Sequence, residues 1–329
     1  MKTIPFLLNL IIIILILSAN NFLYSQDKDK EARNYGYSLG VIYGFVYGQA
    51  QEYVYPTDTK AEYLSELLWD MKPVLYYGLK ADINRNNLMS KTGFFSSVSI
   101  KIGVPRESGA HENRDWVSTE NKNLTHFSSH TNETFEFYWA DAFFGVSIPI
   151  ASYFYIKPFI SGSWMRFAFS GKDGYGKYAR TVDGSYYPID DSPVEYSFEG
   201  MNVIRYKQDW FLAAAGFSIG TEILKPLSFE LSFHITPLTY CAAKDEHLTN
   251  SKTFIDTTSF GLFIEPKGRI SLSLQKMEFS LEAAYRRINN TKGPSYADIG
   301  NIGSYRLSPN EAGAALSLFD VRFSSKICF

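Results

Sequence analysis

Apolar and polar side chains alternate with a period of two along most of this chain, and no other feature constrains the fold as strongly. The clearest stretch, residues 227–236, carries Leu, Phe and Ile on one face and Ser, Glu, His and Thr on the other. Successive residues of a β-strand point to opposite faces, so each such stretch predicts a strand with one apolar and one polar face. After Leu17 no run of about 18 apolar residues occurs, so any later membrane crossing must be made by strands.

Ten segments with this character are predicted, and their connections alternate between short turns and long polar loops. They cover residues 34–55, 62–84, 92–105, 133–149, 153–170, 201–224, 226–243, 257–274, 278–290 and 313–329. An even strand count, that asymmetry and the aromatic Phe329 at the end are typical of bacterial outer-membrane barrels. The expected fold is all-β, a ten-stranded antiparallel transmembrane β-barrel with its long loops outside. A soluble β-sandwich is the alternative, because alternation does not say whether the apolar face meets lipid or a second sheet.

Composition narrows the function classes. Aromatic residues make up 16% of the 329 residues, although mean hydropathy is slightly negative, a combination that suits a barrel in a membrane. The 32 basic side chains do not exceed the 34 acidic ones, so nucleic acid is not an expected partner. The two cysteines, Cys241 and Cys328, are too few for a disulfide scaffold or a thiolate metal cluster.

The amino terminus indicates export. Lys2 precedes an apolar run from Ile4 to Leu17, and small and polar residues follow. The run is about 14 residues long, shorter than the roughly 20 that a membrane-spanning helix needs. Residues 1–25 are therefore predicted to be a signal peptide, and residues 26–329 a single barrel domain. An uncleaved anchor is the competing interpretation.

The candidate chemistry lies in the predicted outer loops. Asp245 and His247 are two residues apart, so on an extended chain they share a face. The carboxylate can then orient the imidazole and stabilise its protonated form. By itself such a pair also occurs by chance in solvated loops. His126 and His130 are four apart, but in a predicted loop that spacing has no helical meaning, and the sequence predicts no metal site.

Several segments, in order and spacing, make the mature chain resemble the omptins, outer-membrane aspartyl-type endopeptidases built as ten-stranded barrels. Besides Asp245-Glu246-His247, they are Gln49-Ala50-Gln51-Glu52-Tyr53-Val54-Tyr55, Leu67-Leu68-Trp69, Glu112-Asn113-Arg114-Asp115-Trp116, Tyr206-Lys207-Gln208, Ile288-Asn289-Asn290-Thr291-Lys292-Gly293 and the aromatic last strand. The Asp-Trp segment and the Asp-x-His segment fall in the second and fourth outer loops of the strand count.

The resemblance implies that a water molecule is held between two pairs of side chains and attacks a peptide bond. His247 would be the general base, Asp245 would orient it, and Asp115 would position and polarise the water. The family's other acid falls on Asn113, whose amide hydrogen-bonds water but carries no charge. The implied function is an outer-membrane endopeptidase, and the alternative is a catalytically impaired surface barrel that acts as an adhesin or binding protein.

The resemblance also implies a substrate pocket and a lipid site. Glu52 matches one of two acids that favour cleavage beside basic residues, while the second position is Ala243. Arg166 matches one basic residue that binds lipopolysaccharide, the family's activator, while Asp209 stands where another arginine is expected. The expected partners are peptide or protein substrates at the cell surface and outer-membrane lipid. No other cofactor is expected, and the protein is expected to act as a monomer.

Strict alternation conflicts with one part of this prediction. Leu227 and Asp245 are an even number of positions apart, so an uninterrupted strand with Leu227 facing lipid would turn Asp245 and His247 toward lipid as well. A bulge or change of phase must therefore occur between them. Pro237 cannot donate to a strand ladder and is the predicted place for it.

Overall fold

The computed structural model describes residues 35–57, 62–85, 92–118, 122–183, 185–187, 189–191, 193–224, 226–274 and 276–329. The predicted signal peptide, residues 1–25, lies outside them. The strands are β1 Tyr35–Tyr55, β2 Ser65–Arg85, β3 Gly93–Gly103, β4 Arg106–Asp115, β5 His126–Ala151, β6 Phe154–Tyr178, β7 Thr181–Val182, β8 Ser185–Tyr186, β9 Val194–Ser197, β10 Asn202–Leu224, β11 Leu227–Thr236, β12 Thr239–His247, β13 Lys252–Ser259, β14 Phe263–Leu274, β15 Met277–Ile299 and β16 Arg306–Cys328.

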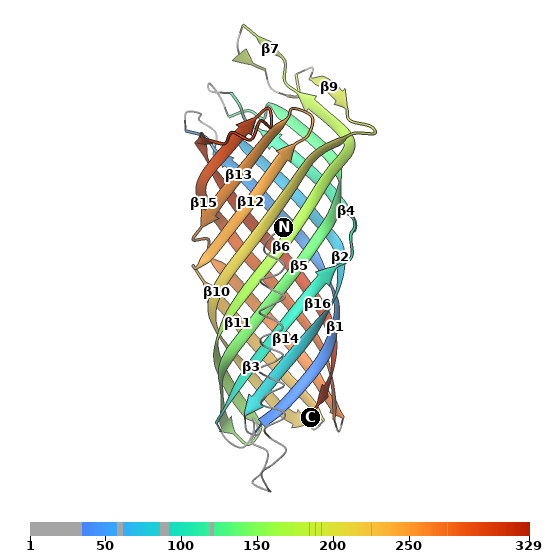
Figure 1. Ribbon diagram of the computed structural model, residues 1–329, viewed down its shortest axis with the longest axis vertical. Coiled ribbons are helices and arrows are strands. Elements are labelled where there is room, and N and C mark those ends of the chain that lie inside the picture. The colour runs from blue at the N-terminus through green and yellow to red at the C-terminus, as the bar shows by residue number, and fades with distance from the viewer. Residues whose placement is uncertain are drawn as a thin grey trace. The chain divides into compact units, whose positions relative to one another are not determined.

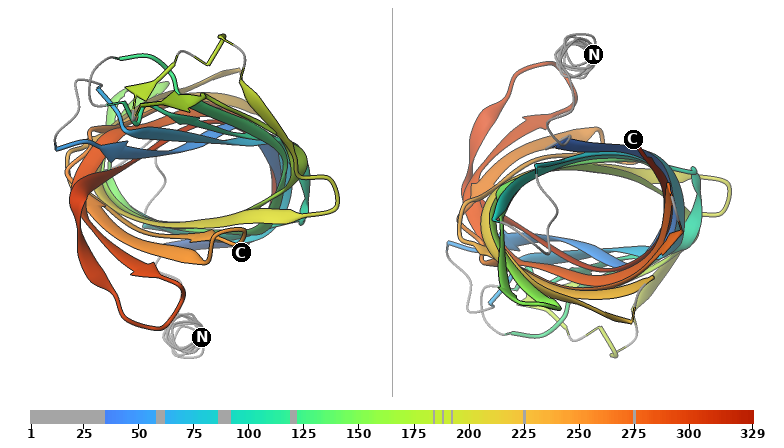
Figure 2. Two further views of the ribbon diagram at one scale, coloured as in Figure 1. Left: turned by 90° about the horizontal axis from the view of Figure 1, so that it is seen from above. Right: turned by 90° about the horizontal axis from the view of Figure 1, so that it is seen from below.

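Apart from β7 and β8, which pair with each other, and β9, which extends the sheet beside the outer end of β6, these strands form one closed antiparallel barrel. Three pairs, β3 with β4, β11 with β12 and β14 with β13, each follow one path around the wall with a short interruption, so the ring has ten strands. The first and last strands meet, because β1 pairs with β16 along its length. Figure 2 shows the ring closed from both ends, and Figure 1 shows the tilt of its strands. The predicted fold class is confirmed.

The outer face carries a belt of exposed apolar side chains. Leu231 is 71% exposed and Ile160 is 64% exposed, values that a water-soluble surface rarely shows in a continuous band. Tyr47, Phe211 and Tyr240 mark the upper edge of the belt. Beyond them the outward positions of β10 and β12 include Lys207, Lys244 and Glu246, so the strand ends above this level are assigned to the outside of the membrane. No helix in the described part of the chain is long and apolar enough to cross a membrane.

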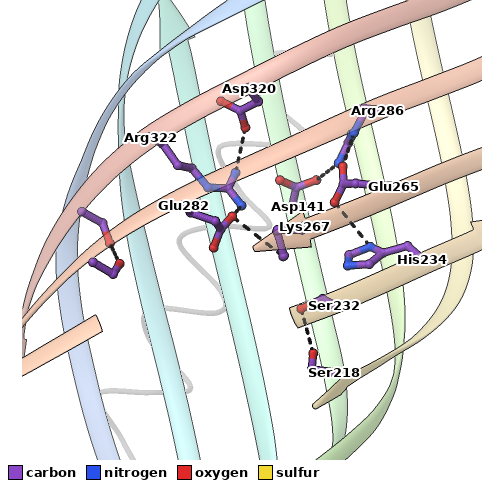
Figure 3. A network of polar contacts seen from close by, with 12 residues as sticks. Asp141, Ser218, Ser232, His234, Glu265, Lys267, Glu282, Arg286, Asp320 and Arg322 are labelled. Atoms are coloured by element: carbon purple, nitrogen blue, oxygen red, sulfur yellow. Dashed lines mark hydrogen bonds and ion pairs between the residues drawn. The ribbon is translucent and has the colours of Figure 1, made fainter. Parts of the chain in front are cut away.

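Paired charges cross the middle of the lumen, and a cavity of about 190 Å³ with charged lining lies below them. Arg286 donates to Glu265 at 2.5 Å and lies 3.7 Å from Asp141, while Arg322 contacts Glu282 and Asp320. These side chains come from β5, β14, β15 and β16 and point inward toward one another (Figure 3). Buried charges are stable only when paired and hydrogen-bonded, so the inward polar residues that give the sequence its alternation also hold the wall together across the lumen.

Above the charges, a layer of large aromatic and apolar side chains closes the barrel. Trp69, Trp139 and Trp210 are each no more than 2% exposed, and Met165 and Phe167 are completely buried. Trp69 stacks on Phe169 and Tyr206 at ring distances of 5.5 and 5.4 Å. The layer separates the charged lumen from the outer mouth, and it forms the floor on which the candidate site is built.

The structure corrects the outer ends of several predicted strands. The segments predicted to end at residues 105, 170, 243 and 290 continue to 115, 178, 247 and 299, and those predicted to begin at 133, 257 and 313 begin at 126, 252 and 306. Above the membrane both faces of a strand contact water, either outside the barrel or at its outer opening. The sequence there no longer alternates between apolar and polar residues, although the chain remains in the sheet. β4, with the sequence RESGAHENRD, is an example. Asp115, Asp245 and His247 therefore lie on strands and not in loops.

The predicted change of phase is present at Pro237. Ala215 of β10 pairs with Ile235, and Leu212 pairs with Thr239, so two residues of β10 face three of the neighbouring strand. Pro237 and Leu238 are exposed one after the other, whereas Thr236 and Thr239 on either side are buried. This one-residue bulge makes β12 present its odd-numbered side chains to the interior.

Candidate active site

The Asp245–His247 pair forms as the sequence predicts, on the inner face of β12. The Asp245 Oδ2 atom lies 2.6 Å from Nε2 of His247, and the two side chains are 2% and 27% exposed. Glu246, between them, points outward and pairs with Lys244 at 2.7 Å. The carboxylate fixes the orientation of the ring, and the contact at Nε2 leaves Nδ1 as the ring nitrogen that can accept a proton.

Asp115 closes the other side of the site, at the end of β4. Its Oδ1 accepts a hydrogen bond of 2.6 Å from Ser65 Oγ, and its Oδ2 accepts one of 3.4 Å from the Asn113 amide. Ser65 also donates to Asn113 Oδ1 at 3.2 Å, so the three side chains form a closed set. Asn113 therefore orients Asp115 but adds no second negative charge.

A cavity of about 390 Å³ lies between these two groups of residues. Asn113, Asp115 and His247 all line it. The remaining lining includes the aromatic side chains Tyr178, Tyr186 and Phe198 and the histidines His111, His126 and His130. Strands far apart in the sequence thus bring a carboxylate and an imidazole to one open volume that is large enough for water and part of a peptide.

The charges of the site influence one another. Burial disfavours the protonated form of His247. The charge and hydrogen bond of Asp245, together with the charge of Asp115, outweigh the effect of burial, so the pKa of His247 is raised above its ordinary value. Burial raises the pKa of Asp115, while Ser65, His126 and His247 act in the opposite direction. An imidazole with a raised pKa is a stronger base, and it accepts a proton once the pH is high enough to leave it neutral.

Glu52 lies deeper, on the inner face of β1, and is 3% exposed. Burial raises its pKa well above the ordinary value, and the charges of Asp245 and Asp256 add to the effect. Ala243, where the resemblance places a second acid, is buried on β12, directly opposite Asp256 of β13. Glu52 is thus close enough to the dyad for their charges to interact.

Arg166 lies on the outer wall, above the apolar belt. Its guanidinium holds Asp209 of the neighbouring strand in a bidentate pair, with distances of 2.7 and 2.9 Å. The Asp209 carboxylate also accepts a hydrogen bond from Trp164 at 3.3 Å. The two positions that the resemblance associates with lipid are thus neighbours on adjacent strands, and in this chain they pair with each other.

The sequence did not point to two residues that contribute to the site. Ser65 precedes the Leu67-Leu68-Trp69 segment, and His126, directly across the ladder from Asp115, interacts with its charge. Both enter through strand pairing, which a single sequence does not reveal. His130 is held by the Asp173 carbonyl at 2.6 Å and the Ser128 hydroxyl at 3.0 Å. No cluster of three metal-ligating side chains occurs in the described ranges.

Comparison with known proteins decides the family. The model of the omptin family matches residues 33–324, which is most of the chain. The chain belongs to the omptin family. The outer-membrane protease OmpT of Escherichia coli has a similar structure, with a TM-score of 0.77 and 17% sequence identity over 93% of this chain and 100% of that one. This omptin is thus an outer-membrane β-barrel with a fold like that of OmpT.

Other comparisons add little. The Pseudomonas putida toluene transporter TodX aligns over 90% of both chains, with 8% identity and a TM-score of 0.31. The translocator domain of the Neisseria meningitidis autotransporter NalP covers 92% of this chain and 90% of that one, with 10% identity and a TM-score of 0.29. No curated protein matches the sequence. Omptins are typically aspartyl-type outer-membrane endopeptidases, which makes peptide hydrolysis the first chemistry to weigh at this site.

Proposed function

We propose that this omptin is an endopeptidase whose nucleophile is a water molecule activated between Asp115 and the Asp245–His247 pair. The observation that carries the proposal is the shared cavity: Asp115 and His247 line the same volume, and each interacts with the charge of the other. A water molecule in that volume can donate one proton toward Asp115 and the other toward His247. Its oxygen is then free to attack a carbonyl carbon.

The reaction needs only one proton carrier. As the water oxygen bonds to the peptide carbon, Nδ1 of His247 takes a proton, and Asp245 stabilises the resulting imidazolium through the 2.6 Å contact. When the carbon–nitrogen bond breaks, the imidazolium returns that proton to the departing amine. The products are a carboxylic acid and an amine, and the enzyme is regenerated.

Asn113 fits this scheme as a hydrogen-bond donor. Two carboxylates at hydrogen-bond distance repel each other, and both are ionised only when a cation such as protonated His247 lies close by. The Asn113 amide supplies a fixed N–H to Asp115 instead. The site keeps its geometry but has less negative charge to stabilise a protonated His247.

The test is hydrolysis of a mixed peptide library by the full-length protein, refolded with and without lipopolysaccharide. His247→Ala should lower kcat/KM by about 10²–10⁴-fold, the usual contribution of general acid–base catalysis. Glu246→Ala is the matched control, because this neighbour points away from the cavity and pairs with Lys244. If the wild-type protein cleaves nothing in either lipid condition, the endopeptidase proposal is wrong.

A second function rests on Asn113 and Ala243, both uncharged at positions where the resemblance places acids. A barrel without catalysis would serve as an adhesin or binding protein through its outer surface. Retention of peptides by the wild-type protein, with no new amino termini after prolonged incubation, would favour this function.

A further inference from the structure

Three buried carboxylates lie close enough for their charges to interact, and each has an oxygen that forms no hydrogen bond among the described residues. Glu52 of β1, Asp245 of β12 and Asp256 of β13 are 3%, 2% and 4% exposed. Glu52 Oε2, Asp245 Oδ1 and Asp256 Oδ1 have no hydrogen-bond partner among the residues that the structure describes. Such atoms are rare in folded proteins, because burying an unpaired polar group costs free energy.

The cluster also lacks a fixed cation. Asp245 pairs with His247, but in the described part of the chain no lysine or arginine forms an ion pair with Glu52 or Asp256. The lumen below is different, since Asp141 and Glu265 there are each matched by a basic side chain. Buried acids without a counter-ion favour entry of a cation from outside.

Strand register puts Asp256 beside the position of Ala243. The two residues are directly opposite each other in the β12–β13 ladder, and both are buried on the inner face. Directly opposite side chains have Cβ atoms about 4.5–5.5 Å apart, and the methyl group of Ala243 takes up little space. A carboxylate on β13 therefore reaches the volume that a longer side chain at Ala243 would occupy.

We propose that Asp256 is a specificity-determining residue that, with Glu52, forms a two-carboxylate pocket for the cationic side chain of the substrate residue beside the cleaved bond. This inference rests on the proposed function, and it adds a residue that the sequence segments of the family do not include. A guanidinium fits better than an ammonium, because its planar fork can bond two carboxylates at once. The expected substrates carry arginine in preference to lysine.

The pocket has its own pH dependence. Burial, with a contribution from Asp245, raises the pKa of Asp256 to about 7 against an opposing hydrogen bond from Ser295. The other titratable groups facing the cluster are Glu52 of β1, Tyr206 of β10 and Cys241 of β12. A bound cation favours the ionised form of Asp256, so binding releases a proton near neutrality. Preference for arginine over a neutral side chain should therefore grow as the pH rises through about 7.

The experiment compares two peptides that differ only by arginine or its neutral isostere citrulline at one position. Asp256→Asn should lower the ratio of their kcat/KM values by about tenfold or more and flatten its rise with pH. Thr257→Asn is the control, since this neighbour lies at the next position of the same strand. Moving the acid across the ladder, with Ala243→Asp combined with Asp256→Ala, should restore the ratio. An unchanged ratio in Asp256→Asn, or an equal fall for both peptides, overturns the proposal.

Binding separates this proposal from the proposed catalysis. In the His247→Ala background the same two peptides bind without being cut, so their dissociation constants report on the pocket alone. Arginine should bind about tenfold or more tightly than citrulline, and Asp256→Asn should remove that difference. If the wild-type protein shows no cleavage and the binding difference is present, the proposed catalysis is wrong and the proposed pocket is supported. If citrulline binds as tightly as arginine, the pocket proposal is wrong whatever the protein cleaves.

Discussion

At the scale of single residues, the candidate site combines a hydrogen-bonded Asp–His pair with an aspartate whose neighbour is an amide. The Asp245–His247 contact has the geometry that general-base catalysis needs, whereas Asp115 has an amide as its neighbour. Asn113 presents its N–H at every pH, so one titration that a pair of carboxylates would show is absent. The chemistry of this site therefore depends on how strongly Asp115 and Asp245 together stabilise a charged His247.

Replacing Asn113 by aspartate tests that dependence. A second carboxylate stabilises protonated His247, so the pKa of His247 rises further above its ordinary value. Because the base works when neutral, activity is lost as pH falls through this pKa, and the rising limb of the pH–rate profile of Asn113→Asp moves to higher pH. On its plateau kcat/KM should increase by about tenfold, since the imidazolium formed in the transition state is better stabilised.

Glu112→Gln is the control for that profile, because Glu112 bonds Arg114 at 2.6 Å on the side of β4 away from the cavity. If the rising limb of the pH–rate profile moves to lower pH in Asn113→Asp, the assignment of His247 as the base is contradicted.

At the scale of elements, the bulge at Pro237 determines where the dyad points. Below it β11 turns even-numbered side chains inward, and above it β12 turns odd-numbered ones inward. Leu227 and Asp245 are an even number of residues apart, so one residue between them must bulge out of the ladder if Leu227 faces lipid and Asp245 faces inward.

Two single-residue deletions test the role of the bulge. Deleting Pro237 removes the extra residue and leaves Leu212 paired with Thr239, so the barrel should fold and cleave peptides. Deleting Ala242, above the bulge, should turn Asp245 and His247 outward and abolish cleavage. Heat-modifiable migration on gels reports folding of both variants. Cleavage by the Ala242 deletion variant at the wild-type rate would show that the strand readjusts. The number of residues between the bulge and the Asp245–His247 pair would then not determine where the pair points.

Sequence patterns predicted the elements well where they cross the membrane and poorly above it. Lipid on one side and a polar lumen on the other force alternation, and Leu227–Thr236 shows it without exception. Above the membrane that constraint ends, so β4 and the outer part of β15 were taken for loops. Asp115, Asp245 and His247 were predicted from short segments in the right order, and the structure places Asp115 and His247 at one cavity. The contact of Ser65 and the proposed role of Asp256 could not be predicted, because both depend on the residues opposite them in neighbouring strands.

At the scale of the whole molecule, the barrel presents a candidate site at its outer end, above a lumen that side chains cross. The aromatic layer with Trp69, Trp139 and Trp210 lies across the lumen, and ion pairs cross it below that layer, above a cavity of about 190 Å³. A lumen packed in this way suits a rigid platform better than a passive channel.

Conductance across a planar bilayer measures this closure directly. The wild-type protein should show no stable open-channel steps, because the buried aromatic side chains lie across the lumen. Replacing Trp139 and Trp210 together by glycine should produce them. Steady conductance by the unmodified protein would contradict a closed lumen and favour a passive pore.

Lipid dependence also belongs to this scale, since it concerns how the outer wall meets the membrane. Arg166 is engaged by Asp209, which leaves less positive charge for a lipid phosphate. Asp209→Arg should strengthen lipopolysaccharide binding and lower the concentration needed for full activity by about tenfold. Activation titrations with purified lipopolysaccharide check this, with Asp209→Asn as the intermediate variant. An unchanged requirement in Asp209→Arg would show that Arg166 is not part of the lipid site.

Closure of the ring by β1 and β16 has a consequence for how a cell can make this protein. Phe329 at the end of the chain donates its backbone N–H to Tyr37 near the start of β1, at 2.8 Å. Until the last strand has emerged from the ribosome, two sheet edges remain open and free to pair with other chains. The polypeptide must therefore be kept from folding during its passage to the outer membrane, and losing even its final strand should leave material that aggregates instead of a smaller barrel.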